Sequence, residues 1–294
     1  MTLANGVHIQ VYRGSSAYSD VKLKEFAARA KSLGVVGLVA HGFQGELPRN
    51  FDSFANICER NCLQASAAWG LGDAGTVQNA ERIGRTIGGV ALHEKCEATL
   101  FDMEGAWEDE QADLPRAHAM FKAFREVAGA AFAGDQPWSM PIPRHHAMPI
   151  WWEIAKYLNA RFPQFYWNNL RKSFGDDAYA IFRAKYEDAW KWFHANRPGP
   201  HPPRFVTVQG YHWRDWTLVD ALCRYAVDAP LVMWCEAFPT ENTEQGMRAW
   251  VALRDRGFTG PRAVEQFQRS PAGVAAGLVV DNKCESKTRT ALGL

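Results

Sequence analysis

The segment Ala98-Thr99-Leu100-Phe101-Asp102-Met103-Glu104 places two carboxylates at the end of an apolar run. The run has the composition of a buried β-strand. Side chains alternate between the two faces of a strand, so Asp102 and Glu104 share one face and Met103 points to the other. Two like charges on one face repel, and a carboxylate pair whose pKa values are split is what acid/base chemistry uses. This segment therefore predicts both a core strand and a candidate site.

Apolar runs of this kind recur along the whole chain and alternate with helical patterns. The periodicity predicts strands at 7–12, 35–40, 63–69, 98–102, 137–141, 164–167, 204–209 and 231–236. Helices are predicted at 20–33, 51–62, 74–95, 114–128, 146–161, 176–196, 216–229 and 244–256. Eight strand and helix units with right-handed crossovers close most economically as a single-domain α/β fold, a (β/α)8 TIM-type barrel. We expect this barrel to cover residues 1–260, with residues 261–294 as a C-terminal extension packed on it.

An open doubly wound sheet is the alternative architecture. Such sheets bind nucleotides through a glycine-rich turn at the end of a strand. Gly70-Leu71-Gly72-Asp73 lacks the third glycine of that fingerprint, and no Walker pattern occurs in the chain. We therefore expect no nucleotide, and the barrel is favoured.

The composition is that of an ordinary globular protein. Of the 294 residues, 47% are apolar and 22% are charged, and the formal net charge is +1. A near-neutral chain has no general attraction to a polyanion, so nucleic acid is not an expected partner. No apolar stretch has the length of a membrane span, and residues 1–6 lack the basic and apolar regions of a signal peptide. We expect synthesis in the cytoplasm and no membrane partner, and the oligomeric state is left open.

The predicted strand ends carry acids, amides and aromatic side chains, and none of them carries a lysine. In a TIM barrel the active site is assembled at the carboxyl ends of the strands. The pattern argues against a Schiff-base aldolase and suits a polysaccharide, whose flat apolar sugar faces stack on aromatic rings. The predicted substrate-binding residues are Tyr12, His41, Trp69, Tyr166, Asn168, Gln209, Tyr211 and Trp234.

Three acids are candidates for catalysis, namely Asp102, Glu104 and Glu236. Glycoside hydrolysis needs one carboxylic acid to protonate the leaving oxygen and a second group to stabilise or trap the oxocarbenium ion. We assign the general acid to Glu104 and expect Asp102 to orient it and to hold a polar group of the substrate. Glu236 follows a strongly apolar strand and is the candidate second carboxylate. Each acid also has a structural alternative, a capping or ion-pairing role at a strand end.

A metal centre is a further alternative for the chemistry. His145, His146 and His212 could join Glu236 as ligands, but their spacing matches no known ligand pattern. We therefore expect no metal and no other cofactor.

About the first 110 residues resemble the family 25 glycoside hydrolases, the barrel lysozymes of phages and bacteria. The resemblance rests on residues 30–36, 41–42, 51–56 and 64–69, and above all on Phe101-Asp102-Met103-Glu104-Gly105, because that family carries an Asp-x-Glu on its fourth strand. It implies a lysozyme-like or endolysin-like enzyme that cleaves peptidoglycan at N-acetylmuramic acid, with Glu104 as the acid and Asp102 assisting. Family 18 chitinases, a weaker similarity, also end their fourth strand in Asp-x-Glu.

The chain departs from the lysozyme pattern on the first strand, where the family has an aspartate and this sequence has Gln10-Val11-Tyr12-Arg13. Two functions therefore follow from the sequence. The first is a glycoside hydrolase acting on an N-acetylhexosamine-containing polysaccharide, at the cell wall or inside a virion. The second is a noncatalytic barrel that binds glycan or serves as a structural component, for example of a phage particle.

Overall fold

The computed structural model describes residues 3–11, 19–47, 50–73, 75–103, 107, 114–137, 150, 153–196, 201–210, 214–235 and 240–294. Within these residues, nine strands form one parallel sheet with the order β6-β5-β4-β3-β2-β1-β9-β8-β7. The strands are β1 (Gly6–Val11), β2 (Gly37–Phe43), β3 (Gln64–Gly70), β4 (Cys96–Met103), β5 (Ala133–Pro137), β6 (Ala160–Arg161), β7 (Gln164–Phe165), β8 (Val206–Gln209) and β9 (Pro230–Cys235).

The two edge strands of this sheet, β6 and β7, are separated in the chain only by Phe162 and Pro163. The short segment 160–165 therefore forms both edges of the sheet. The main-chain N–H of Phe205 donates to the carbonyl of Arg161 at 2.7 Å, and that of Thr207 donates to the carbonyl of Pro163 at 3.0 Å. On the other side, the N–H of Phe162 donates to the carbonyl of Asp135 at 2.7 Å. The sheet thus curls until its ends meet, which is the arrangement of a TIM-like barrel.

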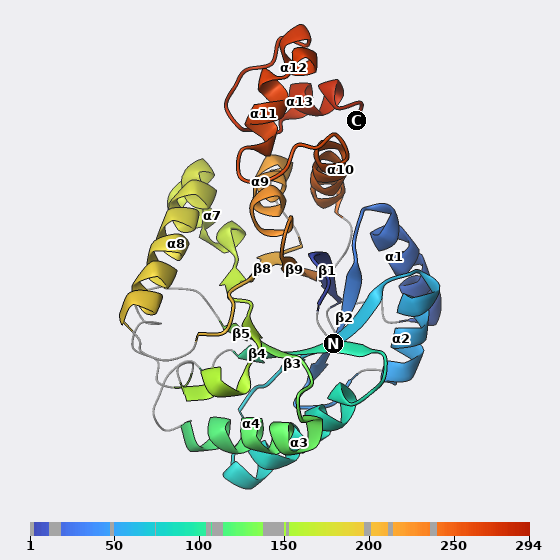
Figure 1. Ribbon diagram of the computed structural model, residues 1–294, viewed down its shortest axis with the longest axis vertical. Helices are drawn as coiled ribbons and strands as arrows, with labels where there is room; N and C mark the ends of the chain where they lie inside the picture. Colours follow the sequence, from blue (N-terminus) through green and yellow to red (C-terminus); the bar gives the residue numbers. More distant parts are fainter. Residues whose placement is uncertain are drawn as a thin grey trace.

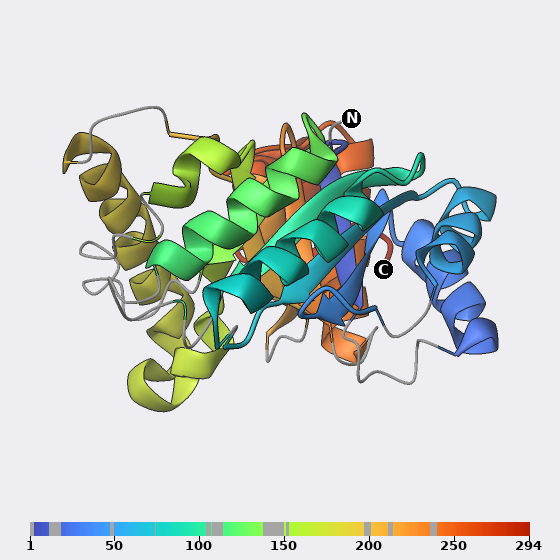
Figure 2. The ribbon, with the colours of Figure 1, turned by 90° about the horizontal axis from the view of Figure 1, so that it is seen from below.

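Helices surround the strands, as Figures 1 and 2 show. They are α1 (Asp20–Ser32), α2 (Phe51–Arg60), α3 (Val77–Ala91), α4 (Leu114–Ala128), α7 (Arg171–Phe174), α8 (Ala178–Asn196), α9 (Asp215–Tyr225) and α10 (Glu241–Asp255). Short 3-10 turns, η4 (Ile154–Tyr157), η5 (Trp167–Leu170) and η6 (Gly175–Asp177), lie between β5 and α8. In Figure 1 the helices α1 and α2 lie on one side of the strands and α7 and α8 on the opposite side.

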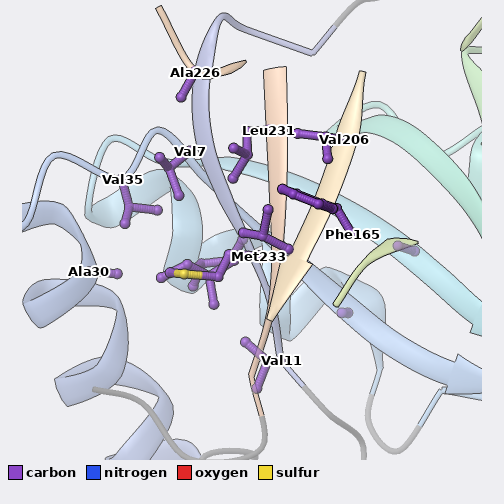
Figure 3. Close-up of a cluster of buried hydrophobic side chains, with 14 of the residues drawn as sticks. Val7, Val11, Ala30, Val35, Phe165, Val206, Ala226, Leu231 and Met233 are labelled. Atoms are coloured by element: carbon purple, nitrogen blue, oxygen red, sulfur yellow. The ribbon is translucent and has the colours of Figure 1, made fainter. Parts of the chain in front are cut away.

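The alternation of side chains along the strands produces two separate apolar cores. The larger core lies between the strands and the helices and includes Val7, Leu231, Met233 and Phe165 (Figure 3). The smaller one contains the residues of opposite parity, including Val39, Leu100, Phe162 and Val232, and fills the barrel. Both sets are fully buried or nearly so, which is why parallel strands read as continuous apolar runs in the sequence.

Histidine 8 also lies inside the barrel and explains a glycine on the neighbouring strand. A Cβ atom at Gly37 would lie 2.3 Å from the His8 Nδ1 atom, so only glycine fits at that position. His8 Nε2 lies 2.8 Å from the carbonyl oxygen of Ala4. Burial lowers the pKa of His8 to about 4, which means that the ring is neutral inside the barrel at pH 7.

Three further helices follow the barrel units: α11 (Ala263–Arg269), α12 (Pro271–Ala275) and α13 (Ser286–Ala291). In Figure 1 they lie beyond α9 and α10, at the periphery of the molecule. Phe267, Cys284 and Leu292 join the helix-facing core. Asn282 Nδ2 donates to Asp220 Oδ1 on α9 at 3.1 Å, so this part of the chain is joined to the barrel helices by polar as well as apolar contacts. We call residues 261–294 the C-terminal helices.

The predicted α/β class and the repeated strand and helix units are confirmed, and several boundaries are wrong, chiefly around the fifth and sixth strands. The fifth strand lies at Ala133–Pro137, before the predicted 137–141. The prediction missed it because Asp135 and Gln136 are polar, although both are fully buried. The predicted helix 146–161 is wrong at its end, where β6 occupies Ala160–Arg161. Pro163 has no N–H to donate, and it splits the sixth strand of the barrel into β6 and β7.

Candidate functional site at the barrel mouth

Polar side chains gather inside the barrel at the carboxyl ends of the strands. Their inward direction follows from hydrogen bonds between strands that are not neighbours in the sheet: Gln136 on β5 bonds to Gln10 on β1, and Gln164 on β7 bonds to Asp102 on β4. We call this group the polar belt; it consists of Gln10, His41, Asp102, Gln136, Gln164, Thr207 and Gln209. Its position is the one where TIM barrels place their active sites.

Asp102 is the carboxylate of the belt. Its Oδ1 accepts a hydrogen bond of 2.7 Å from Gln164 Nε2, and its Oδ2 lies 3.6 Å from His41 Nε2. The Asp102 side chain is 15% exposed and that of His41 is 6% exposed. The carboxylate is therefore fixed at one oxygen by an amide, faces an imidazole with the other, and still reaches the surface of the barrel mouth.

Gln136 lies in register with Asp102 on the neighbouring strand, and its side chain bonds to the opposite wall of the barrel. Its Nε2 donates to Gln10 Oε1 at 2.8 Å and lies 3.2 Å from Thr207 Oγ1. The Thr207 hydroxyl in turn donates to the carbonyl of Phe162 at 2.9 Å. The donors of these side chains are thus directed to acceptors within the barrel, which orders the belt as a network.

Two acceptors of the network remain open. Gln136 Oε1 and Gln164 Oε1 are buried and have no hydrogen-bond partner among the residues that the structure describes. Native proteins satisfy most buried polar atoms through protein groups or ordered water. The belt therefore presents oxygen acceptors, on amides and on one carboxylate, at the barrel mouth.

The predicted site residues His41, Asp102 and Gln209 are brought together in this belt. Gln209 Oε1 accepts from the main-chain N–H of Asn168 at 3.2 Å, so two of the predicted residues are in direct contact. Trp234 on β9 pairs in register with Gln10 on β1 and with Gln209 on β8, and it is partly exposed. Its ring centroid lies 6.4 Å from that of Tyr166.

Trp69 is a correction to the predicted set. It is fully buried and belongs to the helix-facing core, on the side of β3 opposite to the barrel interior. The alternation along the strand gives the physical reason, since Ala68 faces inward and its neighbour Trp69 faces outward. Trp69 is therefore a packing residue.

Four predicted residues, Tyr12, Glu104, Tyr211 and Glu236, lie outside the residues that the structure describes. The histidines His145, His146 and His212 of the metal alternative lie outside them as well. Within the described part of the chain, no three His, Cys, Asp or Glu side chains are grouped as metal ligands would be. No helix of the described residues is long and apolar enough to cross a membrane.

Gln136 and Gln164 are site residues that sequence reasoning missed. Gln136 precedes the predicted fifth strand, and Gln164 begins the predicted sixth strand as a polar residue before an apolar run. A polar residue on the inward parity of a barrel strand is the signal that identifies both of them. That signal is readable only once the strand boundaries are correct.

A buried ion pair lies directly behind the belt. Asp135 and Arg161 pair in register on β5 and β6, and both are almost completely buried, with 3.3 Å between Asp135 Oδ2 and Arg161 Nη2. Burial raises the pKa of Asp135 to about 6 and outweighs the opposite effect of the Arg161 charge. Its neighbour Gln136 faces the barrel interior, so the pair has the parity of the helix-facing side and lies outside the belt.

Comparison with known proteins identifies the fold alone. No family model matches the chain, and no curated protein matches it significantly. Among solved structures, the GH36 alpha-galactosidase AgaA from Geobacillus stearothermophilus, in complex with raffinose, has a TM-score of 0.52 and 10% identity, over 85% of this chain and 42% of that one. This chain thus spans less than half the length of that enzyme.

Two other structures extend the comparison. A protein described as a glycoside hydrolase has a TM-score of 0.54 and 10% identity, over 86% of this chain and 70% of that chain. Octameric ribulose-1,5-bisphosphate carboxylase/oxygenase from Pyrococcus horikoshii has a TM-score of 0.50 and 12% identity, over 98% and 64%. Barrels of unrelated chemistry are thus similar to this chain, and its function has to be argued from the site.

Proposed function

We propose that this protein is a glycoside hydrolase that cleaves an N-acetylhexosamine-containing polysaccharide, with peptidoglycan as the first candidate substrate. The observation that carries the proposal is the Asp102 carboxylate, held by Gln164 and facing His41 within the polar belt at the barrel mouth. In this proposal Glu104, two residues further along the chain, is the general acid.

The chemistry of the belt suits a neutral, hydroxyl-rich ligand. Carboxylate and amide oxygens accept hydrogen bonds, and sugar hydroxyl and acetamido N–H groups donate them. Asp102 would hold such a polar group of the substrate while Glu104 protonates the leaving oxygen, and Glu236, which follows β9, would be the second carboxylate. The two glycoside hydrolases that share the fold support this direction.

The proposal is tested by the release of reducing ends from peptidoglycan and from chitooligosaccharides. Glu104→Gln should lower turnover about 100-fold or more, since a positioned general acid contributes on the order of 10²–10⁴-fold. Glu97→Gln is the matched control, because Glu97 lies on the same strand at its amino end. Glu104→Gln protein that is folded and turns over at the wild-type rate would exclude the assignment.

A second candidate function is a noncatalytic barrel that binds glycan, as a wall-binding or particle component. The observation in its favour is Gln10, which stands where the lysozyme-like pattern has an aspartate and whose side-chain oxygen is already bound by Gln136. This candidate predicts glycan binding by calorimetry without any reducing ends over long incubation. Multiple turnover by the wild-type protein would exclude it.

A further inference from the structure

The side-chain amide of Gln164 lies between two acceptors. Its Nε2 is 2.7 Å from Asp102 Oδ1 and 3.2 Å from the main-chain oxygen of Gln136. Only an NH₂ group can donate to both, so the partners themselves determine which end of the amide faces them. A glutamate at this position would bring a second carboxylate against Asp102.

The second acceptor is part of a rigid element. The oxygen of Gln136 belongs to β5, and the Gln136 side chain is bonded to Gln10 and Thr207 on the far side of the barrel. Gln164 thus links the Asp102 carboxylate to a wall of the barrel that is fixed by its own hydrogen bonds. Because Oδ1 is occupied in this way, Oδ2 is the Asp102 oxygen left to face His41 and a ligand.

We propose that Gln164 is a positioning residue that fixes the orientation of the Asp102 carboxylate for the reaction. The proposal rests on the glycoside hydrolase function proposed above. It assigns no contact between Gln164 and the substrate. Its physical basis is that a reacting or substrate-holding group displaced by about 1 Å can lose on the order of 100-fold in rate.

The chain contains a matched control for this residue. Gln268 in α11 is as deeply buried as Gln164, and its Nε2 likewise donates to an aspartate and to a main-chain oxygen, namely Asp281 Oδ1 at 3.0 Å and the carbonyl of Lys283 at 3.1 Å. It belongs to the C-terminal helices, far from the belt in the fold. Loss of either amide removes one hydrogen bond to an aspartate and one to a main-chain oxygen, and only one of the two amides touches Asp102.

The experiment compares Gln164→Leu, Gln164→Glu and Gln268→Leu with the wild type. Melting temperature, kcat, KM and the pH dependence of kcat are measured on peptidoglycan or chitooligosaccharides, and a crystal structure of Gln164→Leu is determined. We expect a larger fall in melting temperature for Gln268→Leu, because Gln268 Oε1 also accepts two main-chain hydrogen bonds. We expect kcat to fall about 100-fold, at nearly unchanged KM, in Gln164→Leu alone.

Gln164→Glu replaces the donor to Asp102 with an ionisable group of nearly the same size, and complements the comparison of kcat and KM in the leucine variants. The new carboxyl and Asp102 would share a proton at low pH and repel each other once both ionise. The alkaline limb of the kcat profile should therefore move to lower pH, with activity kept under acidic conditions. An unshifted profile, or equal kcat values for the two leucine variants, would overturn the positioning role.

The crystal structure decides the positioning role without any activity. In Gln164→Leu the Asp102 carboxylate should turn away from its present direction, and a carboxylate that stays in place contradicts the inference. If the wild type cleaves no glycan and Asp102 nevertheless turns in the variant, the proposed function fails while the positioning role stands. The two failures are thus distinguished.

Discussion

The barrel mouth and the C-terminal helices each contain a buried glutamine that donates to an aspartate. The two glutamines differ in the hydrogen bonds that their side-chain oxygens accept. Gln268 Oε1 accepts from the main-chain N–H groups of Asp281 and Asn282, at 3.2 and 3.1 Å. Gln164 Oε1 has no such partner among the described residues, although its Nε2 bonds are just as short. The protein itself therefore bonds both ends of the Gln268 amide, whereas the described residues bond only the Nε2 end of the Gln164 amide.

A buried polar atom without a protein partner costs free energy. Among the described residues such atoms also occur away from the belt, for example at Trp69 Nε1 and Ser66 Oγ, so the contrast between the two glutamines depends on their surroundings as well. At the mouth the cost coincides with a partly exposed carboxylate and with an opposing imidazole. The same residue types thus have different surroundings in the two regions, and substitutions in each region test this contrast.

The largest expected loss of stability is at Asp220, which joins the C-terminal helices to α8 and α9. Its Oδ2 accepts from the Tyr179 hydroxyl, from Arg183 Nη1 at 3.1 Å and from Arg224 Nε at 2.6 Å, and its Oδ1 accepts from Asn282. Asp220→Ala should lower the free energy of unfolding by about 3 kcal/mol or more, because it leaves the buried Tyr179 hydroxyl and two partly exposed guanidinium groups unpaired. Urea denaturation measures the loss.

Glycan turnover below the lowered melting temperature is the control for Asp220→Ala. The rate should equal that of the wild type, since Asp220 lies on α9 and its hydrogen bonds go to residues outside the belt. A variant that remains stable but loses turnover would break the division between the two regions.

Protonation of His8 should destabilise the barrel interior in acid, whereas Glu265 of the C-terminal helices keeps its charge in the same pH range. The folded state lowers the pKa of His8 from 6.5 to about 4, so the unfolded chain binds this proton first as the pH falls. The stabilisation is complete above pH 6.5 and is lost between pH 6.5 and 4, by about 3 kcal/mol. In the C-terminal helices, Arg262 and Arg269 lower the pKa of Glu265 to about 2, so this carboxylate keeps its charge throughout that range.

Denaturation of wild type and His8→Gln at several pH values isolates this effect. Asp135 acts in the opposite direction, because its raised pKa makes the folded state bind a proton between pH 6 and 3.8. The contribution of Asp135 is common to the wild type and His8→Gln, so it cancels when their free energies of unfolding are subtracted. A difference in unfolding free energy that stays constant from pH 7 to pH 4 would contradict the buried, neutral His8.

The smallest expected effect is at Asn282, whose backbone has a φ of 59°. Its Nδ2 donates to Asp220 Oδ1 and to the carbonyl of Pro261, and Asn282→Gly should cost about 1 kcal/mol from the lost hydrogen bonds. Asn282→Ala should cost roughly 1 kcal/mol more, because a Cβ disfavours the left-handed region. Melting temperatures of the two variants give the comparison, and a more stable alanine variant would refute it.

Much of the fold could be predicted because buried parallel strands are apolar on both faces. The runs that became β2, β3, β4 and β9 have this pattern, and those that became β1 and β8 are apolar on their helix-facing side; all six were predicted within a few residues of their bounds. The fifth strand was misplaced because Asp135 and Gln136 are made compatible with burial by Arg161 and Gln10, which are distant in sequence. Pairings of this kind arise only when the barrel closes.

Some residues of the candidate site could be predicted from the sequence, and others could not. Alternation along one strand was enough to identify Asp102, and the strand-end rule was enough for His41 and Gln209. Trp69 was assigned to the wrong face because the parity of β3 was not considered. Gln164 begins the predicted sixth strand and has the inward parity, but its bond across the barrel to Asp102, 62 positions away in the chain, could not be read from local patterns.

The most direct test of the central claim, that the barrel mouth is the hydrolytic site, is the rate of reducing-end release by Asp102→Asn measured beside Asp281→Asn. Both changes replace the aspartate partner of a buried glutamine with its isostere. We predict that Asp102→Asn keeps its melting temperature and loses about 100-fold or more in turnover, while Asp281→Asn turns over at the wild-type rate. Wild-type turnover by folded Asp102→Asn would contradict the account.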